Sequence, residues 1–179
     1  MLGKVRLSDS TLPNSPSSPP LADNTAMLTH HRRPVCLSLI STDLPILSTI
    51  ETAATLYQKD FDRFHLLLHQ GETKTETPNV ESAPQLLWLE LSPNRVVLTR
   101  QGNSQFSYRH FWERGIYGTS RYWLNQHEQH LSDSFRLRNF TRDITLSGAP
   151  LPDFLRVEYE LWSAQECLGH YVLHLEIYH

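Results

Sequence analysis

The chain has 179 residues and a formal net charge of −3, a length that fits one domain with additional segments. Residues 1–34 hold four basic and two acidic side chains, so residues 35–179 have a net charge of −5. This negative charge argues against general electrostatic binding to nucleic acid. The sequence has no apolar run of membrane-spanning length and no secretory signal pattern, so we expect a cytoplasmic protein. Its two cysteines, Cys36 and Cys167, lie far apart, and we expect both to be free thiols.

The first half of the chain predicts a tail followed by a long helix. Residues 1–33 are rich in Ser and Pro and lack apolar periodicity, so we expect a disordered tail before a single domain over 34–179. Residues 35–40 fit either a short strand or the approach to the helix. From about residue 43 to 70, apolar residues recur at spacings of three and four, which is typical of one helical face. These residues are Ile46, Leu47, Ile50, Ala53, Ala54, Tyr57, Phe61, Phe64 and Leu68.

The second half predicts strands. Alternating patterns over 86–91, 96–99 and 105–112 are followed by longer ones over 134–146, 154–163 and 169–178. Between these two groups, Thr119 or Ser120 caps a predicted short helix that ends near Leu131. The short connections indicate an antiparallel sheet of five to seven strands with a C-terminal meander. The predicted fold class is therefore α+β, with the long helix packed on one face of the sheet.

The segment from Phe106 to Trp123 is unusually dense in rings and guanidinium groups, with seven aromatic residues and three arginines. On a strand, Phe106, Tyr108, His110 and Trp112 share one face. The planar guanidinium group of arginine binds carboxylates or phosphates and stacks on aromatic rings. The segment fits a covered core, a protein interface or a small-molecule pocket. The residues that we expect to bind a ligand or partner are Arg109, Trp112, Arg114, Tyr117, Arg121, Tyr122 and Trp123.

No metal site and no cofactor are predicted. The weak metal candidates are His174 and Glu176, two residues apart on one strand, with Glu158 on the neighbouring strand. An ordinary solvated face with cross-strand ion pairs explains the same pattern. The His65 and His69 pair is a second weak candidate, at helical spacing.

No P-loop, dinucleotide glycine motif, nucleophile elbow or other catalytic pattern is visible, so we expect a non-enzymatic protein. The first functional hypothesis is an accessory or assembly protein that binds a partner protein through the aromatic and arginine side chains. The alternative is a small-molecule-binding protein, or a small lyase-type enzyme, for an anionic aromatic ligand. Single-stranded RNA binding is disfavoured by the acidic balance. A concave pocket formed by these residues favours the alternative, and a flat array favours the interface.

Overall fold

The fold was examined in a computed structural model, which describes residues 30–70, 85–101, 106–125 and 132–179. The described residues form strands and turns, with no helix among them. Accordingly, none of these residues belongs to a helix long and apolar enough to cross a bilayer. The strands are β1 His30–Ser41, β2 Leu47–Asp60, β3 Arg63–Gln70, β4 Gln85–Leu91, β5 Arg95–Gln101, β6 Phe106–Glu113, β7 Tyr117–Asn125, β8 Ser132–Ser147, β9 Phe154–Ser163 and β10 Glu166–Ile177.

The ten strands close into an antiparallel barrel in which each strand pairs with its neighbours in the sequence. The barrel closes where β1 pairs with β10 on one side and with β2 on the other, as in the register of Leu37 opposite Leu175 and Ile50. Closure removes the exposed edges that an open sheet would present to other chains.

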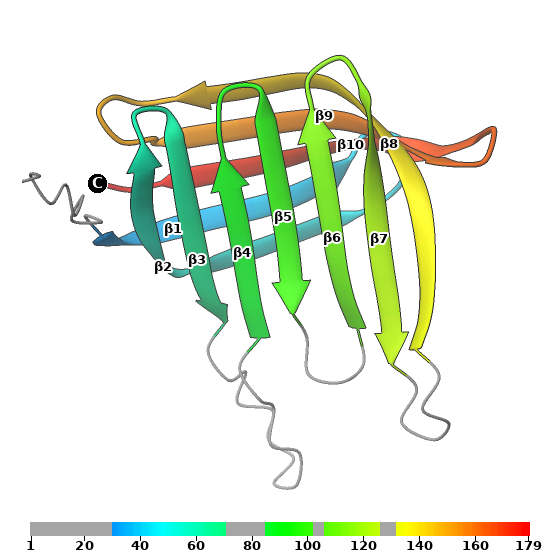
Figure 1. Ribbon diagram of the computed structural model, residues 1–179, viewed down its shortest axis with the longest axis horizontal. Helices are drawn as coiled ribbons and strands as arrows, with labels where there is room; N and C mark the ends of the chain where they lie inside the picture. Colours follow the sequence, from blue (N-terminus) through cyan, green and yellow to red (C-terminus); the bar gives the residue numbers. More distant parts are fainter. Residues whose placement is uncertain (1–29, 71–84, 102–105, 126–131) are drawn as a thin grey trace, which may run out of the picture.

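The barrel is flattened into two layers (Figure 1). β3 to β7 form one layer, and the strands β1, β9 and β10 cross behind it. β2 and β8 bend, so that each contributes to both layers. They are the longest of the described strands, with 14 and 16 residues. β8 has a register shift at Thr141/Asp143, close to its bend, and β2 has one at Gln58/Asp60, beside the turn into β3. Bulges of this kind bend a strand and let a sheet turn a corner.

Alternate side chains along each strand point into the barrel, as the period of two requires. One part of the interior is filled by aliphatic side chains with almost no exposed surface. They include Val35, Leu56, Leu66, Leu89, Ile144 and Leu155. This packed part fixes the strands that carry the remaining, more aromatic part of the interior.

The structure shows that the α+β prediction is wrong, because the predicted helix over 43–70 is the hairpin of β2 and β3. Leu56 of β2 pairs with Leu66 of β3, and the chain reverses between Asp60 and Arg63, where Phe61 is 94 % exposed. On a strand, Ala54 and Leu56 are buried by the period of two, so the helical spacing was coincidental.

The short helix predicted from Thr119 or Ser120 is wrong over its described residues. Residues up to Asn125 form β7, which pairs with β6 and β8, and residues 126–131 lie outside the described part of the chain. Ring-bearing and hydroxyl side chains suit the pleated surface of a paired strand better than a helix.

The other predicted strands were found close to their expected positions, and β9 has the predicted bounds, Phe154–Ser163. The uncertain strand over 35–40 is part of β1, which begins at His30. Most of the predicted disordered tail, residues 1–29, lies outside the described residues.

Candidate functional site: a ring-lined cavity inside the barrel

A cavity of about 270 Å³ occupies the part of the barrel that the aliphatic core does not fill. Its walls come from both layers, because β1, β2, β9 and β10 contribute from one side and β4 to β7 from the other. Leu39, Ile50, Leu98 and Leu173 supply aliphatic surface to the wall. The cavity therefore depends on barrel closure and on no single loop.

Rings cover much of the wall. On β6, the inward positions hold Phe106, Tyr108, His110 and Trp112, and each ring contacts the next along the strand. The His110 and Trp112 rings are nearly parallel, with centroids 4.9 Å apart. Tyr122 of β7 packs on this row with its centroid 5.4 Å from that of His110.

Two tyrosines of the opposite layer continue the wall. Tyr159 of β9 lies 5.0 Å from Trp112 between ring centroids, and Tyr171 of β10 stacks on Tyr159 at 5.4 Å. The ring faces and edges fit a flat apolar molecule, because aromatic pairs prefer offset-stacked or edge-to-face contacts.

Arg100 of β5 is the charged residue in the described lining. Its guanidinium carbon lies 5.8 Å from the centroid of the Tyr108 ring, and its side chain hydrogen-bonds the Tyr108 phenol. A guanidinium has five N–H donors, so it can bind a carboxylate while it keeps its contact with Tyr108.

His110 is held by a buried hydrogen-bonded chain. The Asn139 amide donates to Ser120 Oγ over 2.8 Å, and Ser120 Oγ lies 2.8 Å from His110 Nδ1. The Ser120 hydroxyl can donate to Nδ1 or accept from Nδ1–H, and the tautomer of His110 sets the direction of this bond.

Burial favours the uncharged forms of the histidine and the tyrosines in the cavity wall. It lowers the pKa of His110 to about 4, and burial is also the main cause that raises the pKa of Tyr122 to about 12. It raises the pKa of Tyr108 and, still more strongly, that of Tyr159. The phenols are therefore neutral at physiological pH, and Arg100 supplies the positive charge.

The structure divides the predicted binding residues between two faces. Trp112 and Tyr122 line the cavity, whereas Arg109, Arg121 and Trp123 occupy outward positions on β6 and β7. Tyr117 is 55 % exposed and lies under the Arg138 guanidinium, 4.9 Å from ring centroid to carbon.

Arg114 lies in the turn between β6 and β7. It donates to the carbonyl of Ile144 and forms an ion pair with Asp143, with 3.4 Å between Nε and Oδ1. The set that the sequence grouped together therefore does not form one site.

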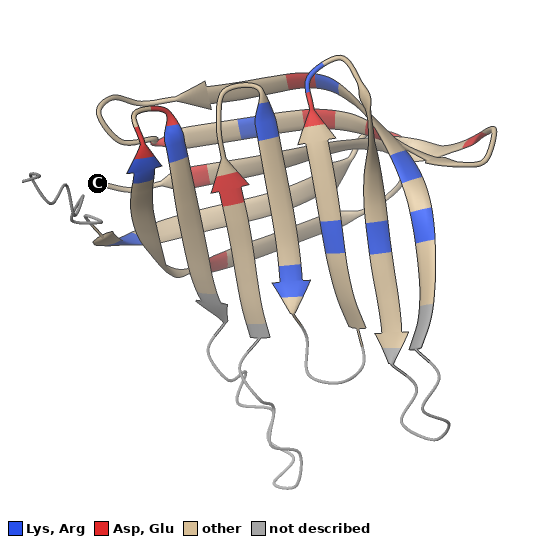
Figure 2. Cartoon of the chain, in the orientation of Figure 1, with Lys and Arg blue, Asp and Glu red and all other residues tan. Residues whose placement is uncertain are grey.

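The outward arginines form a row across three strands. Arg109 is paired directly with Arg121, and Arg121 with Arg136 of β8. We call these three residues the arginine row; Figure 2 shows blue segments side by side on β6, β7 and β8. Glu90 approaches Arg109 with 3.8 Å between Oε1 and Nη2, and within the described ranges no carboxylate pairs with Arg121 or Arg136.

The weak metal candidates lie on the outer face of β9 and β10. Nε2 of His174 is 3.9 Å from Oε1 of Glu176, but Glu158 forms its ion pair with Arg156. In the part of the chain that the structure describes, these three do not form a cluster with metal-binding spacing. His65 contacts the Trp88 ring, and the side chain of His69 lies outside the description.

Several cavity residues were missed from the sequence, above all Arg100, Tyr159 and Tyr171. The alternation of β9 and β10 already placed the two tyrosines on one face, but it did not show that this face encloses a cavity. Pairing of β5 with β6 sets Arg100 opposite Tyr108, but only barrel closure brings the rings of β9 and β10 to the same cavity.

Comparison with known proteins gives a likeness in fold alone. No protein-family model and no curated protein matches the sequence. Among solved structures, the ywiB protein from Bacillus subtilis is similar, with a TM-score of 0.56 and 10 % sequence identity. The match covers 84 % of this chain and 94 % of that one, so the likeness extends over nearly the whole barrel.

Proposed function

We propose that this protein binds a small aromatic ligand with one anionic group, such as an aromatic carboxylate, inside the barrel. The observation that carries the proposal is the cavity of about 270 Å³, lined by rings from four strands and by the guanidinium of Arg100. Its volume lies near the lower end of the range for ligand pockets, which suits a compact molecule of one or two rings.

The arrangement of polar groups supports a single anionic end on the ligand. A planar guanidinium pairs with a carboxylate through two parallel hydrogen bonds. The neutral Tyr108 phenol and the neutral His110 imidazole add uncharged polar groups, while Trp112, Tyr122 and Tyr159 provide apolar surface for the rings. A dianion would leave one charge without a cationic partner in the described lining, which is costly in an apolar site.

The proposal is tested by a thermal-shift screen of the full chain against aromatic carboxylates and their neutral amides. A ligand at 100 times its dissociation constant stabilises the folded state by about 2.7 kcal/mol. For a chain of this size, that corresponds to roughly 5 to 10 °C in melting temperature. We expect carboxylates to raise the melting temperature more than the matching amides, because only the carboxylates can pair with Arg100.

A pair of matched variants locates the ligand. Arg100→Gln should abolish the preference for carboxylate over amide, while Arg109→Gln should leave it unchanged, because Arg109 lies on the outer face of the neighbouring strand. The proposal is wrong if no compound of the panel shifts the melting temperature, or if Arg109→Gln removes the shift and Arg100→Gln does not.

The arginine row favours a second function, the binding of an acidic partner protein to the outer wall of β6, β7 and β8. Like charges placed directly opposite each other destabilise a sheet, and an acidic partner would relieve this repulsion. The neighbouring rings of the exposed Tyr117 and the half-buried Phe140 pack on each other with centroids 5.0 Å apart and extend the surface.

This second function is tested by quantitative affinity capture from the native cell with three baits. Acidic proteins that bind the unaltered chain should be lost with the Arg121→Glu, Arg136→Glu double variant. They should be retained with Arg156→Glu, a charge reversal on β9 away from the row. Equal recovery with all three baits would exclude the row as the interface.

A further inference from the structure

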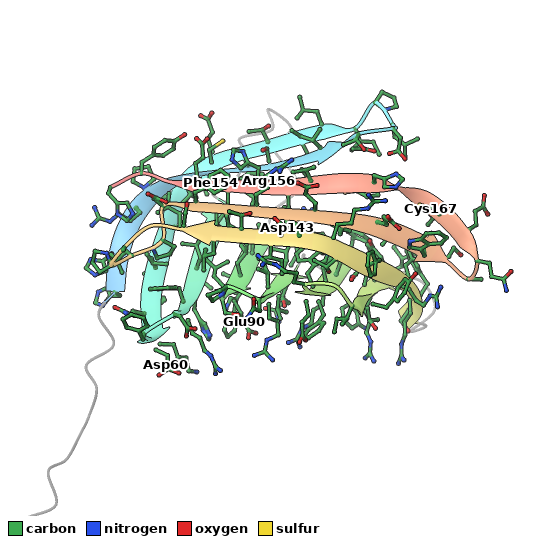
Figure 3. The ribbon with its side chains drawn as sticks, turned by 90° about the horizontal axis from the view of Figure 1, so that it is seen from above. Asp60, Glu90, Asp143, Phe154, Arg156 and Cys167 are labelled. Carbon is green, nitrogen blue, oxygen red and sulfur yellow. The ribbon has the colours of Figure 1, made fainter. Side chains whose placement is uncertain are left out.

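The hairpin of β9 and β10 gathers a cysteine, a histidine and a glutamate on the outer face of the barrel. One donor atom from each of Glu160, Cys167 and His170 lies within 4.8 Å of those of the other two. Glu160 and His170 are direct cross-strand partners. Cys167 lies near the end of the hairpin, far from Phe154 at the other end of β9 (Figure 3).

A β-bulge explains why Cys167 joins the other two. Three residues apart on a regular strand, Cys167 and His170 would point to opposite faces. The register shifts between Cys167 and Gly169, and Cys167 is consequently paired with Trp162, whose side chain shares the outer face with that of Glu160. Bulges re-aim side chains in this way and are common beside functional sites.

His170 is oriented as a ligand would be. Its Nδ1 lies 3.0 Å from Oδ2 of Asp43, and its backbone N–H donates to Oδ1 of the same carboxylate over 3.0 Å. Asp43 also accepts a hydrogen bond from the Ser41 hydroxyl at 2.9 Å. With its Nδ1 proton held by Asp43, the ring presents the lone pair of Nε2. Metal-bound histidines usually donate their other N–H to a carboxylate in this manner.

Glu160 is fixed just as firmly. Trp162 Nε1 donates to its Oε2 over 2.9 Å, and Arg142 Nε donates to Oε1 over 2.6 Å. Oε1 lies 3.7 Å from Nε2 of His170, too far for a hydrogen bond. Two ligands of one tetrahedral zinc ion are separated by about 3.4 Å, so a small movement would bring both atoms onto one ion.

We propose that Glu160, Cys167 and His170 bind a zinc ion, with Asp43 orienting the histidine. Zinc accepts mixed sulfur, nitrogen and oxygen ligands, whereas magnesium and calcium take oxygen ligands alone. Three protein ligands leave one coordination position for water or another small ligand. Arg142 has to share Oε1 with the ion, and its positive charge weakens binding without preventing it.

The test is a titration of the full chain, without an affinity tag, with zinc by calorimetry and with cobalt(II) by absorption. We expect one ion per chain and a near-ultraviolet band from a cobalt–thiolate bond. Cys167→Ser should remove the band, and His170→Ala should abolish one-to-one binding. Asp43→Ala should weaken zinc binding about 10- to 100-fold, the usual effect of removing an outer partner.

Two further variants separate metal binding from a structural role. Arg142→Gln should bind zinc more tightly, because a competing positive charge is removed. His174→Ala, which removes a half-buried histidine from the outer face of the same strand, should bind zinc unchanged. The proposal is overturned if the unaltered protein binds no zinc one-to-one, or if its cobalt complex lacks the thiolate band. One-to-one binding that survives Cys167→Ser and His170→Ala unchanged would overturn it as well.

Discussion

His110 shows what burial does to a single titratable residue. Its ring is enclosed by Trp112 at 4.9 Å and Tyr122 at 5.4 Å between centroids, and its Nδ1 is bound to Ser120. These partners are uncharged, so nothing among them compensates a positive imidazolium. The folded protein therefore holds His110 neutral under conditions in which an exposed histidine would be protonated.

This burial predicts a loss of stability in acid. The pKa of His110 is lowered from 6.5 to about 4 in the folded protein. Between these values the unfolded chain binds a proton that the folded chain does not, so the free energy of unfolding falls as the pH is lowered. At about 1.4 kcal/mol per pKa unit, this one residue contributes a loss of about 3 kcal/mol by pH 4.

Urea unfolding at pH 7 and pH 4.5 measures this effect. Other groups titrate in the same range, so the comparison is between the unaltered chain and His110→Gln, which should lose less stability on acidification. His174→Gln on the outer face should behave like the unaltered chain. An identical pH dependence in all three proteins would show that His110 is already accessible to protons.

At the scale of the element, strand identity was predictable where alternation and turn residues coincide. Phe154–Ser163 alternates cleanly, and the Gly and Pro residues of 147–152 mark its start, so its bounds and its buried face were found from the sequence. The turn between β2 and β3, Asp60-Phe61-Asp62-Arg63, contains neither Gly nor Pro, so the sequence does not mark this hairpin. Because no turn residue separates them, the apolar residues on both sides have the spacing of one helical face.

The candidate site was predictable only in part, for a related reason. Alternation placed Trp112 with Phe106, Tyr108 and His110 on one face of a strand, and the structure places this face inside the barrel. Arg109, which lies between them, had to point the other way. Which face surrounds a cavity depends on closure between β1 and β10, strands more than 120 residues apart at Ser41 and Tyr171, and no local pattern encodes that contact.

Gly118 supplies a prediction about how β7 fits its neighbours. A Cβ at this buried position would lie 2.1 Å from the carbonyl oxygen of Phe111 and 2.6 Å from Oδ1 of Asn139. Because the first contact is with backbone, Gly118→Ala must displace β6 from β7. We expect the free energy of unfolding to fall by about 3 kcal/mol, the upper part of the range for overpacking, as measured by urea unfolding.

Gly115 is the matched control for this prediction. Its φ of 76° favours glycine, but a Cβ there meets nothing within 4 Å. Gly115→Ala should therefore cost only the strain of a left-handed conformation, about 1 kcal/mol. If both variants lose the same stability, close approach of β6 and β7 is not what requires Gly118.

At the scale of the whole molecule, strand number explains why a cavity exists. Barrel diameter grows with the number of strands, and eight strands already give an interior that side chains just fill or that holds one small ligand. Ten strands enclose a larger interior, and flattening of the barrel into two layers removes only part of this extra volume. Aliphatic side chains fill one region, and the ring-lined cavity of about 270 Å³ remains in the other.

A substitution that fills the cavity tests ligand binding without disrupting the fold. Leu173 of β10 is 2 % exposed and lines the cavity, whereas the adjacent Val172 belongs to the outer face. Leu173→Trp should occupy cavity volume, keep the fold and weaken binding of an aromatic carboxylate by more than tenfold. Val172→Trp should leave affinity unchanged. Circular dichroism first shows that both variants are folded, and calorimetric titration then measures their affinity for the ligand. Full affinity in Leu173→Trp would place the ligand outside the barrel.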